Sequence, residues 1–549
     1  MKKLLCVLTV FVMLFGVMST AAFAAEPGTT YYVDSVNGSD LSDGTTEAKA
    51  WKSLERASAQ TYSAGDSVLF NAGQVFTGSF TAHGDGSAEY PVTLGAYGDT
   101  ENKGMPLLLH TGTDTLMSIV NVSHWVIEDL EMSSPDGSGI RIWAEKYCED
   151  ITVRNCSIHN VWYHQTQYAQ GSRAAIYMGA LGVGAMIKGL TLSGLNIYNC
   201  GYALHMHGNT MEWGADTFVS PEVSYSQNWL FEGLAISDIL YDAMAICSVN
   251  NLNIRNCSII DTCLNDDYYT APLWMHHAKN VLVEHCEIAG SRNQMDGMTV
   301  DFDGWTTDST YQYIYSHDNV RFMQNCVYDD TTRNRNCTVR YCLSVRDNIL
   351  KNNNNLLNSS AYTDSDNPTC MENLRFYNNT IIDGSQFDFA ICDNSMIQNN
   401  IFCGGLYAFV TAKPISITNA DGSETDKYKT FGGVISNNCY YLTEVPLIDF
   451  DSCFDKPLFA GTDYDDINSF MLSSNSPLIG AGVRVEKNMG TQDFYGNPIN
   501  ADTVHNIGCY EGSGVDDGQT AGSFDSLLAA LTDVLGRIMW FYTLIAYLF

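Results

Sequence analysis

The amino-acid sequence predicts an all-β protein, a right-handed, single-stranded parallel β-helix (solenoid) of roughly ten or more coils. Three observations predict it. One six-residue phrase recurs along the chain from about residue 120. The intervals between its copies, about 21 to 39 residues, are too irregular for leucine-rich repeats or propeller blades. Long stretches with the apolar spacing of helices are nearly absent.

Composition and hydropathy set the domain boundaries. In chain order we predict a signal peptide over residues 1–24, an N-terminal cap with the first coils over residues 25–118, the β-helix domain over residues 119–511, a linker over residues 512–523 and a hydrophobic tail over residues 524–549. The first segment has a basic start, an apolar run and a small-residue cleavage site. The sequence therefore predicts a secreted protein, extracellular or associated with the cell surface.

The cap and the tail are the two places where helices are expected. Apolar residues at Trp51, Leu54 and Ala57 have helical spacing, so the cap should contain a short helix over 51–59. The tail is apolar from Leu527 onward, but charged residues interrupt it and the clean run is too short for a membrane span. We predict a C-terminal amphipathic helix that associates with a membrane or the cell surface.

The recurring phrase consists of an apolar residue, two polar residues, a stacked residue, one further residue and, in most copies, a second apolar residue. Its copies cover residues 127–132, 153–158, 192–197, 231–236, 254–259, 283–288, 339–344, 376–381 and 397–402, with weaker copies around His317 and Asn438. Each coil can bury its apolar residues only against the coils on either side. The phrase therefore predicts one strand of each coil and the turn that follows it.

Cysteines need a separate explanation, because 17 of them in a secreted chain would ordinarily suggest disulfides. Four fall at the stacked position, where a small apolar side chain suits an inward row: Cys156, Cys257, Cys286 and Cys342. We predict that most of these are free buried thiols, with disulfides as the alternative. At the same position, Asn379 and Asn400 are predicted to form hydrogen-bonded rungs.

A second strand follows each phrase, and its outward side chains should form a continuous surface because adjacent strands lie about 4.8 Å apart. This surface is predicted to bind substrate through Tyr177, His205, His207, Trp274, His276, Arg321 and Lys351. Aromatic rings stack on the apolar faces of sugars, and imidazoles hydrogen bond to sugar hydroxyls. The surface therefore favours glycan recognition.

The stretch 294–305 adds three carboxylates to this surface, Asp296, Asp301 and Asp303. In a strand, Asp301 and Asp303 point to one face and Val300 to the other. Residues two apart on a strand are about 6.6 to 6.8 Å apart at Cα, which suits the paired carboxyl groups of glycosidases. Mutual repulsion should raise one pKa, as a general acid requires. The alternative is that Asp296 and Asp303 only cap turns beside glycines.

Net charge limits the partners. The chain has 28 Lys and Arg against 62 Asp and Glu, a net charge of −34. Nucleic acid is excluded because phosphate binding needs a basic surface. A neutral glycan is favoured, since a polyanionic one would need Ca²⁺ or a local basic cluster. No resident cofactor is expected, apart from Ca²⁺ held by Asp301 and Asp303 if the protein is a lyase.

Several segments together resemble the pectate-lyase-like β-helix superfamily of secreted carbohydrate-active proteins: the start over residues 31–40, Ala50–Leu54, the recurring phrase and the 296–303 run. That acidic run resembles the one in β-helix glycoside hydrolases such as lacto-N-biosidases, which use two nearby aspartates. The resemblance implies that Asp303 is the nucleophile and Asp296 the acid/base, with Asp301 the substitute for either.

Three functions remain open. The first is a secreted glycoside hydrolase acting on a neutral or host-type glycan. The second is a Ca²⁺-dependent polysaccharide lyase, in which carboxylates hold Ca²⁺ and Lys351 or Arg321 abstracts the C5 proton of a uronate. The third is a non-catalytic surface β-helix that binds glycan or cell wall.

Overall fold

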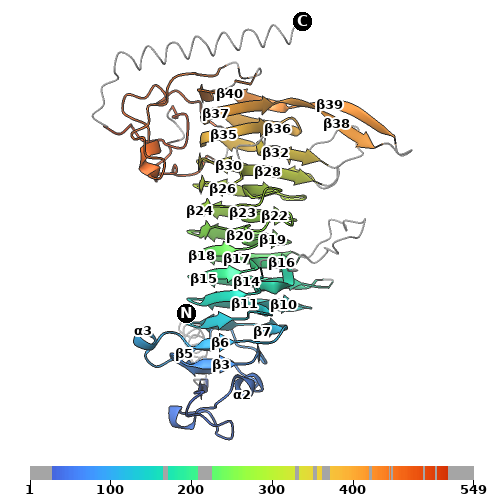
Figure 1. Ribbon diagram of the computed structural model, residues 1–549, viewed down its shortest axis with the longest axis vertical. Helices are drawn as coiled ribbons and strands as arrows, with labels where there is room; N and C mark the ends of the chain where they lie inside the picture. Colours follow the sequence, from blue (N-terminus) through green and yellow to red (C-terminus); the bar gives the residue numbers. More distant parts are fainter. Residues whose placement is uncertain are drawn as a thin grey trace, which may run out of the picture.

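The computed structural model describes residues 28–164, 171–182, 184–207, 225–327, 333–349, 355–361, 371–418, 423–443, 445–446, 449, 451–485, 489–500 and 504–516. Within them the chain winds into a parallel β-helix whose coils stack along one long axis (Figure 1). The predicted fold class is confirmed. The predicted signal peptide and hydrophobic tail lie outside the described residues.

Strand pairing gives three parallel ladders, and most coils contribute one strand to each. The first ladder contains β1 (Thr30–Val33), β2 (Ser67–Asn71), β5 (Val92–Tyr97), β8 (Trp125–Glu128), β11 (Tyr147–Arg154), β14 (Met186–Ser193), β17 (Ser226–Glu232), β20 (Val249–Arg255), β23 (Lys279–Glu284), β26 (Thr310–Gln312), β30 (Thr338–Arg340), β34 (Arg375–Tyr377), β36 (Cys392–Gln398) and β40 (Gly432–Ser436), with the short β29 (Asn334–Arg335) and β33 (Met371–Glu372) beside them.

The second ladder contains β3 (Val75–Thr77), β6 (Leu107–Leu109), β9 (Glu131–Ser133), β12 (Ser157–Val161), β15 (Asn196–Cys200), β18 (Ala235–Ile239), β21 (Ser258–Ile260), β24 (Glu287–Ala289), β27 (Tyr315–His317), β31 (Leu343–Val345), β35 (Thr380–Asp388), β37 (Ile401–Val410) and β41 (Cys439–Tyr441). The third contains β4 (Phe80–Thr81), β7 (Thr115–Val120), β10 (Ser138–Ala144), β13 (Ala174–Ala180), β16 (Tyr202–His207), β19 (Met244–Cys247), β22 (Leu273–His276), β25 (Met298–Phe302), β28 (Arg321–Val327) and β32 (Asn355–Ala361).

A residue in the left-handed region turns the chain between the first and second ladders. Asn155, Asn256, Asn378 and Asn399 stand at this turn with φ between 51° and 55°. Asparagine tolerates this conformation better than most residues, because its short polar side chain can hydrogen bond locally. The turn explains the second polar residue of the recurring phrase, which occupies this place.

The stacked residues that follow the turn point into the solenoid, as predicted. Cys156, Cys257, Cys286 and Cys342 are buried free thiols. The asparagine rungs are also present: Nδ2 of Asn379 donates to the carbonyl of Val339 at 3.0 Å and to Oδ1 of Asn400 at 3.1 Å. Buried amides need such partners. Both predictions about the inward row are confirmed for these residues.

Helices are few and short in the described part of the chain. The helix predicted over 51–59 is present as α2 (Leu54–Ser58), where the side chain of Ser53 caps the N-terminus. It is shorter than predicted because Trp51 instead forms a bridge with Val33 of β1. The remaining helical turns are α3 (Thr100–Lys103), η1 (Glu47–Lys49), η2 (Gly171–Arg173) and η3 (Ile467–Phe470).

Two features depart from the regular stack near its C-terminal end. The antiparallel hairpin of β38 (Ala412–Thr418) and β39 (Glu424–Thr430) projects from the last coils (Figure 1). The segment after β41 folds back along the side of the solenoid: Cys509 donates its backbone N–H to Thr380, and Glu511 accepts from the Tyr341 hydroxyl at 3.0 Å. This segment corresponds to the predicted end of the β-helix domain.

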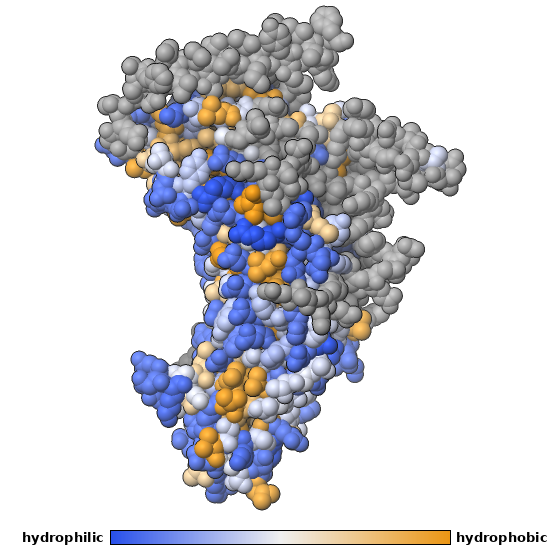
Figure 2. All heavy atoms as spheres, viewed as in Figure 1, coloured by the Kyte–Doolittle hydropathy of each residue, from blue (hydrophilic) through white to orange (hydrophobic). Residues whose placement is uncertain are grey.

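Apolar side chains fill the solenoid and leave a largely hydrophilic exterior on the face shown in Figure 2. One continuous core runs from Val33 to Phe454. In the described part of the chain no helix has the length and apolar character that a membrane crossing requires.

Candidate active site

One outward row on the third ladder brings together four residues that were predicted to form the substrate surface and the acidic site. Strand register aligns the row from β10 to β28 as Arg141, Tyr177, His205, Ala245, Trp274, Asp301 and Gln324. At about 4.8 Å per strand, the path from His205 to Asp301 is about 14 Å long. An aromatic and imidazole row thus leads along the solenoid to a carboxyl group.

Strand β25 orients Asp301 as the alternation predicts. Met298, Val300 and Phe302 belong to the core, so Asp301 faces outward between Trp274 and Gln324. It is nevertheless only 4% exposed. Its Oδ1 has no hydrogen-bond partner among the described residues.

The electrostatic surroundings of Asp301 favour its protonated form. Burial raises the pKa of this carboxyl well above its usual range, and the neighbouring Asp303, Asp296 and Asp242 carboxylates raise it further. Three other acids are therefore close enough to interact with Asp301. The predicted grouping of Asp296, Asp301 and Asp303 is present in the structure.

Asp296 lies in the loop between β24 and β25. Its backbone N–H and that of Met295 donate to Oδ1 of Asn293, both at 2.9 Å. Burial raises the pKa of Asp296 to about 6, against the lowering effects of the Arg321 charge and of a hydrogen bond from Gln324. A carboxyl group with a pKa in this range can hold a proton for a leaving group near neutral pH.

Asp303 follows the end of β25 and shares the outward direction of Asp301. Its backbone N–H continues the ladder by donating to the carbonyl of Met275 at 2.8 Å. The Thr306 hydroxyl donates to the backbone carbonyl of Asp303 at 2.7 Å. Asp303 is only partly buried, so its carboxylate is more accessible than that of Asp301.

Arg321 holds the acidic loop through its backbone carbonyls. Its guanidinium donates to the backbone carbonyls of Met295 at 2.7 Å and Asp296 at 3.3 Å. Burial lowers its pKa, while the Asp296 and Asp301 carboxylates oppose that shift. Arg321 was predicted to line a subsite, and its contacts place it as a cation that supports the loop.

His276 does not lie on the predicted outward surface. It is fully buried beside His277, with the two Nδ1 atoms 3.2 Å apart, and the Trp305 ring packs edge-on against it. Burial lowers the pKa of His276 to about 3, so the ring is neutral. The covering residues are His277, which has a φ of 49°, and Trp305 of the following coil, on which His277 stacks. Lys351 and the side chain of His207 lie outside the described residues.

Sequence reasoning missed a fourth carboxyl group, Asp242. It is 5% exposed, and its Oδ1 accepts the backbone N–H of Ala271 at 2.9 Å. Burial raises its pKa to about 7, and the Asp296 charge adds to the shift against a hydrogen bond from the Trp274 side chain. Asp242 stands two residues before β19, as Asp296 stands two residues before β25. Strand register places Asp242 level with Met298 and not with Asp296, so the repeat pattern of the sequence did not point to it.

The arrangement combines acids in unlike environments with one cation and an aromatic ring. Asp296 can donate a proton near neutral pH, and Asp303 offers a more accessible carboxylate. Trp274, predicted to bind substrate, is only 8% exposed, packs in the core and hydrogen bonds to Asp242. The described residues contain no group of three or more His, Cys, Asp or Glu side chains arranged to hold a metal ion.

Comparisons with known proteins were made on both sequence and structure. No protein-family model matches the chain. A stretch of 95 residues, 17% of this chain, is 39% identical to a lacto-N-biosidase of Bifidobacterium longum subsp. longum. The predicted resemblance to lacto-N-biosidases is confirmed. The match spans only 6% of that relative's length.

Solved structures with similar chains were also found. A GH136 lacto-N-biosidase from Eubacterium ramulus aligns over 77% of this chain and 66% of its own, with 18% identity and a TM-score of 0.49. An alginate lyase from Paenibacillus sp. aligns over 56% of this chain and 93% of its own, with 12% identity and a TM-score of 0.32.

Proposed function

We propose that this protein is a glycoside hydrolase that cleaves a neutral or host-type glycan, with Asp296 as general acid/base and Asp303 as nucleophile. The observation that carries the proposal is the pairing of unlike carboxyl groups around Asp301. Burial raises the pKa of Asp296, in the loop before β25, to about 6, and Asp303, directly after β25, is only partly buried. Glycosidases need one acid that holds a proton and one carboxylate that does not.

The proposed chemistry follows from these positions. Asp296 protonates the glycosidic oxygen as the bond to the anomeric carbon breaks, and Asp303 attacks that carbon from the opposite side. Asp296, now a carboxylate, then takes a proton from a water molecule whose oxygen attacks the anomeric carbon. The bond between that carbon and Asp303 breaks, which releases the sugar and returns Asp303 to a carboxylate and Asp296 to an acid. A protonated Asp301 between them carries no competing charge, and it is the substitute for either role.

The proposed substrate is uncharged. A net charge of −34 repels polyanionic glycans. Tyr177 and His205 are partly exposed in the outward row, where their rings can stack on a sugar. The name of the sequence relative adds lacto-N-biosides to the substrates to be tested first.

A glycan panel tests the proposal directly. The protein is incubated with neutral oligosaccharides, including an aryl lacto-N-bioside, and products are identified by mass spectrometry. We expect saturated sugars from the wild type and none from Asp303→Asn. The matched control is Asp85→Asn, another Asp-Gly loop acid, which caps Ser123 at the far end of the solenoid and should stay active.

Other outcomes would select the competing functions. Unsaturated, ultraviolet-absorbing products whose release stops with a chelator would indicate a Ca²⁺-dependent lyase. Glycan binding without products, retained when Asp296, Asp301 and Asp303 are all replaced, would indicate a binding protein. Either result would overturn the hydrolase proposal.

We further propose that the chain is secreted and that its tail associates with a membrane or the cell surface. The basic start and apolar run of residues 1–24 and the apolar segment 524–549 support this. N-terminal sequencing of the protein should place the first residue near Ala25. Deletion of 524–549 should move the protein from cells into the medium, and retention on cells would contradict the role of the tail.

A further inference from the structure

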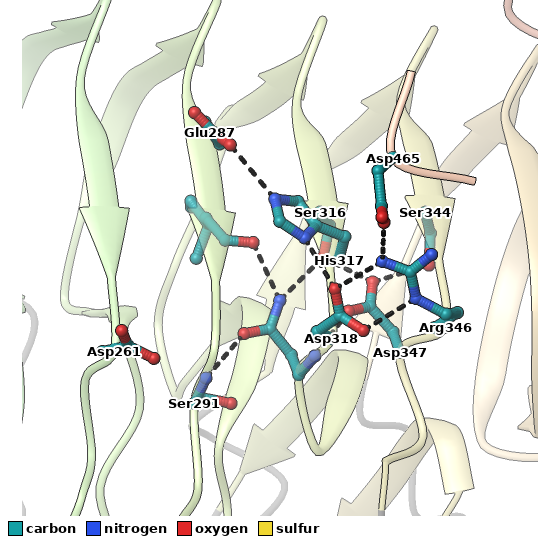
Figure 3. Close-up of polar contacts among 12 residues, drawn as sticks. Asp261, Glu287, Ser291, Ser316, His317, Asp318, Ser344, Arg346, Asp347 and Asp465 are labelled. Atoms are coloured by element: carbon teal, nitrogen blue, oxygen red, sulfur yellow. Dashed lines mark hydrogen bonds and ion pairs between the residues drawn. The ribbon is translucent and has the colours of Figure 1, made fainter. Parts of the chain in front are cut away.

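A buried hydrogen-bond network connects the Asp296 loop to the two coils that follow it (Figure 3). It starts at Asp347, immediately after β31, and ends at the loop before β25. Its members are not charged partners of the acids described above, and Asp347 is not among the groups that shift the pKa of Asp296 or Asp301. The connection runs through hydrogen bonds alone.

Asp347 anchors the network. It is 1% exposed, and Figure 3 shows it between Ser316 and Ser344. Its Oδ2 accepts both hydroxyls, at 2.5 Å and 2.7 Å, and its Oδ1 accepts the backbone N–H of Asn319 at 3.0 Å. Three donors converge on one carboxylate, which fixes the position of Asn319.

Asn319 connects Asp347 to the preceding coil, which contains the acids, through three hydrogen bonds of its side chain. It is fully buried, and its Nδ2 donates to the carbonyl of Ile288 at 2.8 Å and to Oγ1 of Thr299 at 3.0 Å. Its Oδ1 accepts the backbone N–H of Ser291 at 3.0 Å. One side chain therefore holds the end of β24, the start of the acidic loop and β25 itself.

Ser291 completes the path to the loop. Its hydroxyl donates to the carbonyl of Gly297, the residue after Asp296, at 2.5 Å. Gly297 has a φ of 65°, and a Cβ at this position would lie 2.5 Å from the carbonyl oxygen of Asn293. The loop has little freedom to settle elsewhere, since Gly297 also donates its backbone N–H to the carbonyl of Thr270 at 2.9 Å.

We propose that Asp347 is a positioning residue that fixes the carboxyl group of Asp296 through Asn319 and Ser291. The network bonds to the chain before Asp296, at Ser291, and after it, at Gly297 and Thr299, which a purely local cap would not do. This inference rests on the proposed function for its effect on turnover. Its effect on the loop can be measured without any substrate.

The test compares two buried aspartates that accept hydrogen bonds, although Oδ1 of Asp449, unlike that of Asp347, has no partner among the described residues. Asp449 is also 1% exposed and accepts from an asparagine amide, Asn438, and a hydroxyl, Tyr440, but in the last coils. Both Asp347→Asn and Asp449→Asn should lower the melting temperature. Only Asp347→Asn should accelerate amide hydrogen exchange in the peptide over residues 291–299, measured by mass spectrometry without substrate.

Turnover supplies the second readout, on the aryl lacto-N-bioside or whichever panel glycan the wild type cleaves. Asp347→Asn should lower kcat about 10- to 100-fold with KM changed less than about threefold, because a misplaced acid impairs chemistry more than binding. Asp449→Asn should leave kcat within about twofold. Ser291→Ala, a smaller change, should act in the same direction if Asp347→Asn does not fold.

Two results would overturn the proposal. One is unchanged exchange over 291–299 in both Asp347→Asn and Ser291→Ala. The other is an equal loss of kcat in Asp347→Asn and Asp449→Asn, which would reduce Asp347 to general stability. If the wild type cleaves no glycan, the proposed function fails, while the exchange data still decide whether Asp347 fixes the loop.

Discussion

Asp301 and Asp347 are buried to nearly the same degree, 4% and 1% exposed, and burial raises the pKa of both, yet their hydrogen bonds and neighbouring charges differ. Asp347 accepts three hydrogen bonds from Ser316, Ser344 and Asn319. Asp301 has an oxygen without a partner among the described residues and faces three other carboxyl groups. Burying unsatisfied, mutually repelling acids costs free energy that folding alone does not require. The contrast separates a carboxyl that builds the fold from a cluster suited to chemistry.

The sharpest way to break this contrast is to remove the accessible member of the cluster. Asp303→Asn should lower kcat about 10⁴-fold or more, because a nucleophile cannot be replaced by its neighbours. Its folding should be nearly unchanged, since the carboxylate is only partly buried. Kinetics and thermal unfolding measured on the same sample check both statements. A variant that keeps wild-type kcat would remove Asp303 from the mechanism.

The role of Asp296 as general acid can be tested by the pH dependence of kcat/KM and by the dependence of kcat on the leaving group. Because its pKa is about 6 and the acid must be protonated, kcat/KM should fall as pH rises through about 6. Asp296→Asn should abolish this alkaline limb and lower kcat about 10²- to 10³-fold on a natural glycan. On an aryl glycoside whose leaving group is acidic, the same substitution should lower kcat far less, because that leaving group needs no proton. Equal losses on both substrates would argue against a general acid.

The features of the site that the sequence predicts are those that depend only on the pattern of neighbouring residues. Alternation along Val300, Asp301 and Phe302 gave the correct faces of β25 because the side-chain period of a strand is two. The same rule gives His276 an outward direction but not its burial, because Trp305 on the next coil packs against the ring. Asp242 was missed for a related reason, since it lies two coils before Asp296 in the chain and only the folding of the loops brings the two acids close enough to interact. Long-range stacking, not local propensity, decided both.

Stability should respond in opposite directions at the two places. At pH 8, Asp301→Asn should stabilise the protein by roughly 1 to 3 kcal/mol. Folding must bind a proton to bury Asp301 in its neutral form at that pH, whereas the amide is already neutral and can also donate to the adjacent carboxylates. Asp347→Asn should destabilise it by roughly 1 to 3 kcal/mol, because an amide supplies fewer acceptor sites to three donors. Urea unfolding of both variants measures the difference. If both substitutions changed the free energy of unfolding in the same direction, the distinction between Asp301 and Asp347 would be wrong.

The same cluster fixes the sign of the pH dependence of wild-type stability. Asp242 and Asp296 have folded-state pKa values raised to about 7 and about 6, so the folded protein binds their protons more tightly than the unfolded chain does. Their stabilising contribution is complete below about pH 4 and is lost as pH rises through 6 to 7. Asp242→Asn should flatten the fall in unfolding free energy over this range. An unchanged slope would show that Asp242 does not titrate there.

The smallest effect is expected from substitutions in the part of the outward row that is farthest from the acids. Tyr177 and His205 stand in register with Trp274 and Asp301, and their rings stack with centroids 6.2 Å apart. A glycan that follows the row would reach them only if it extends several sugars from the cleaved bond, since His205 is about 14 Å from Asp301 along the ladder. Replacing either ring with alanine should raise KM about 3- to 10-fold for long oligosaccharides, the value of one aromatic contact. It should leave disaccharide KM unchanged. An equal change in KM for long oligosaccharides and for the disaccharide would mean that the substrate does not run along the solenoid axis. The two rings would then contribute to packing and not to substrate binding.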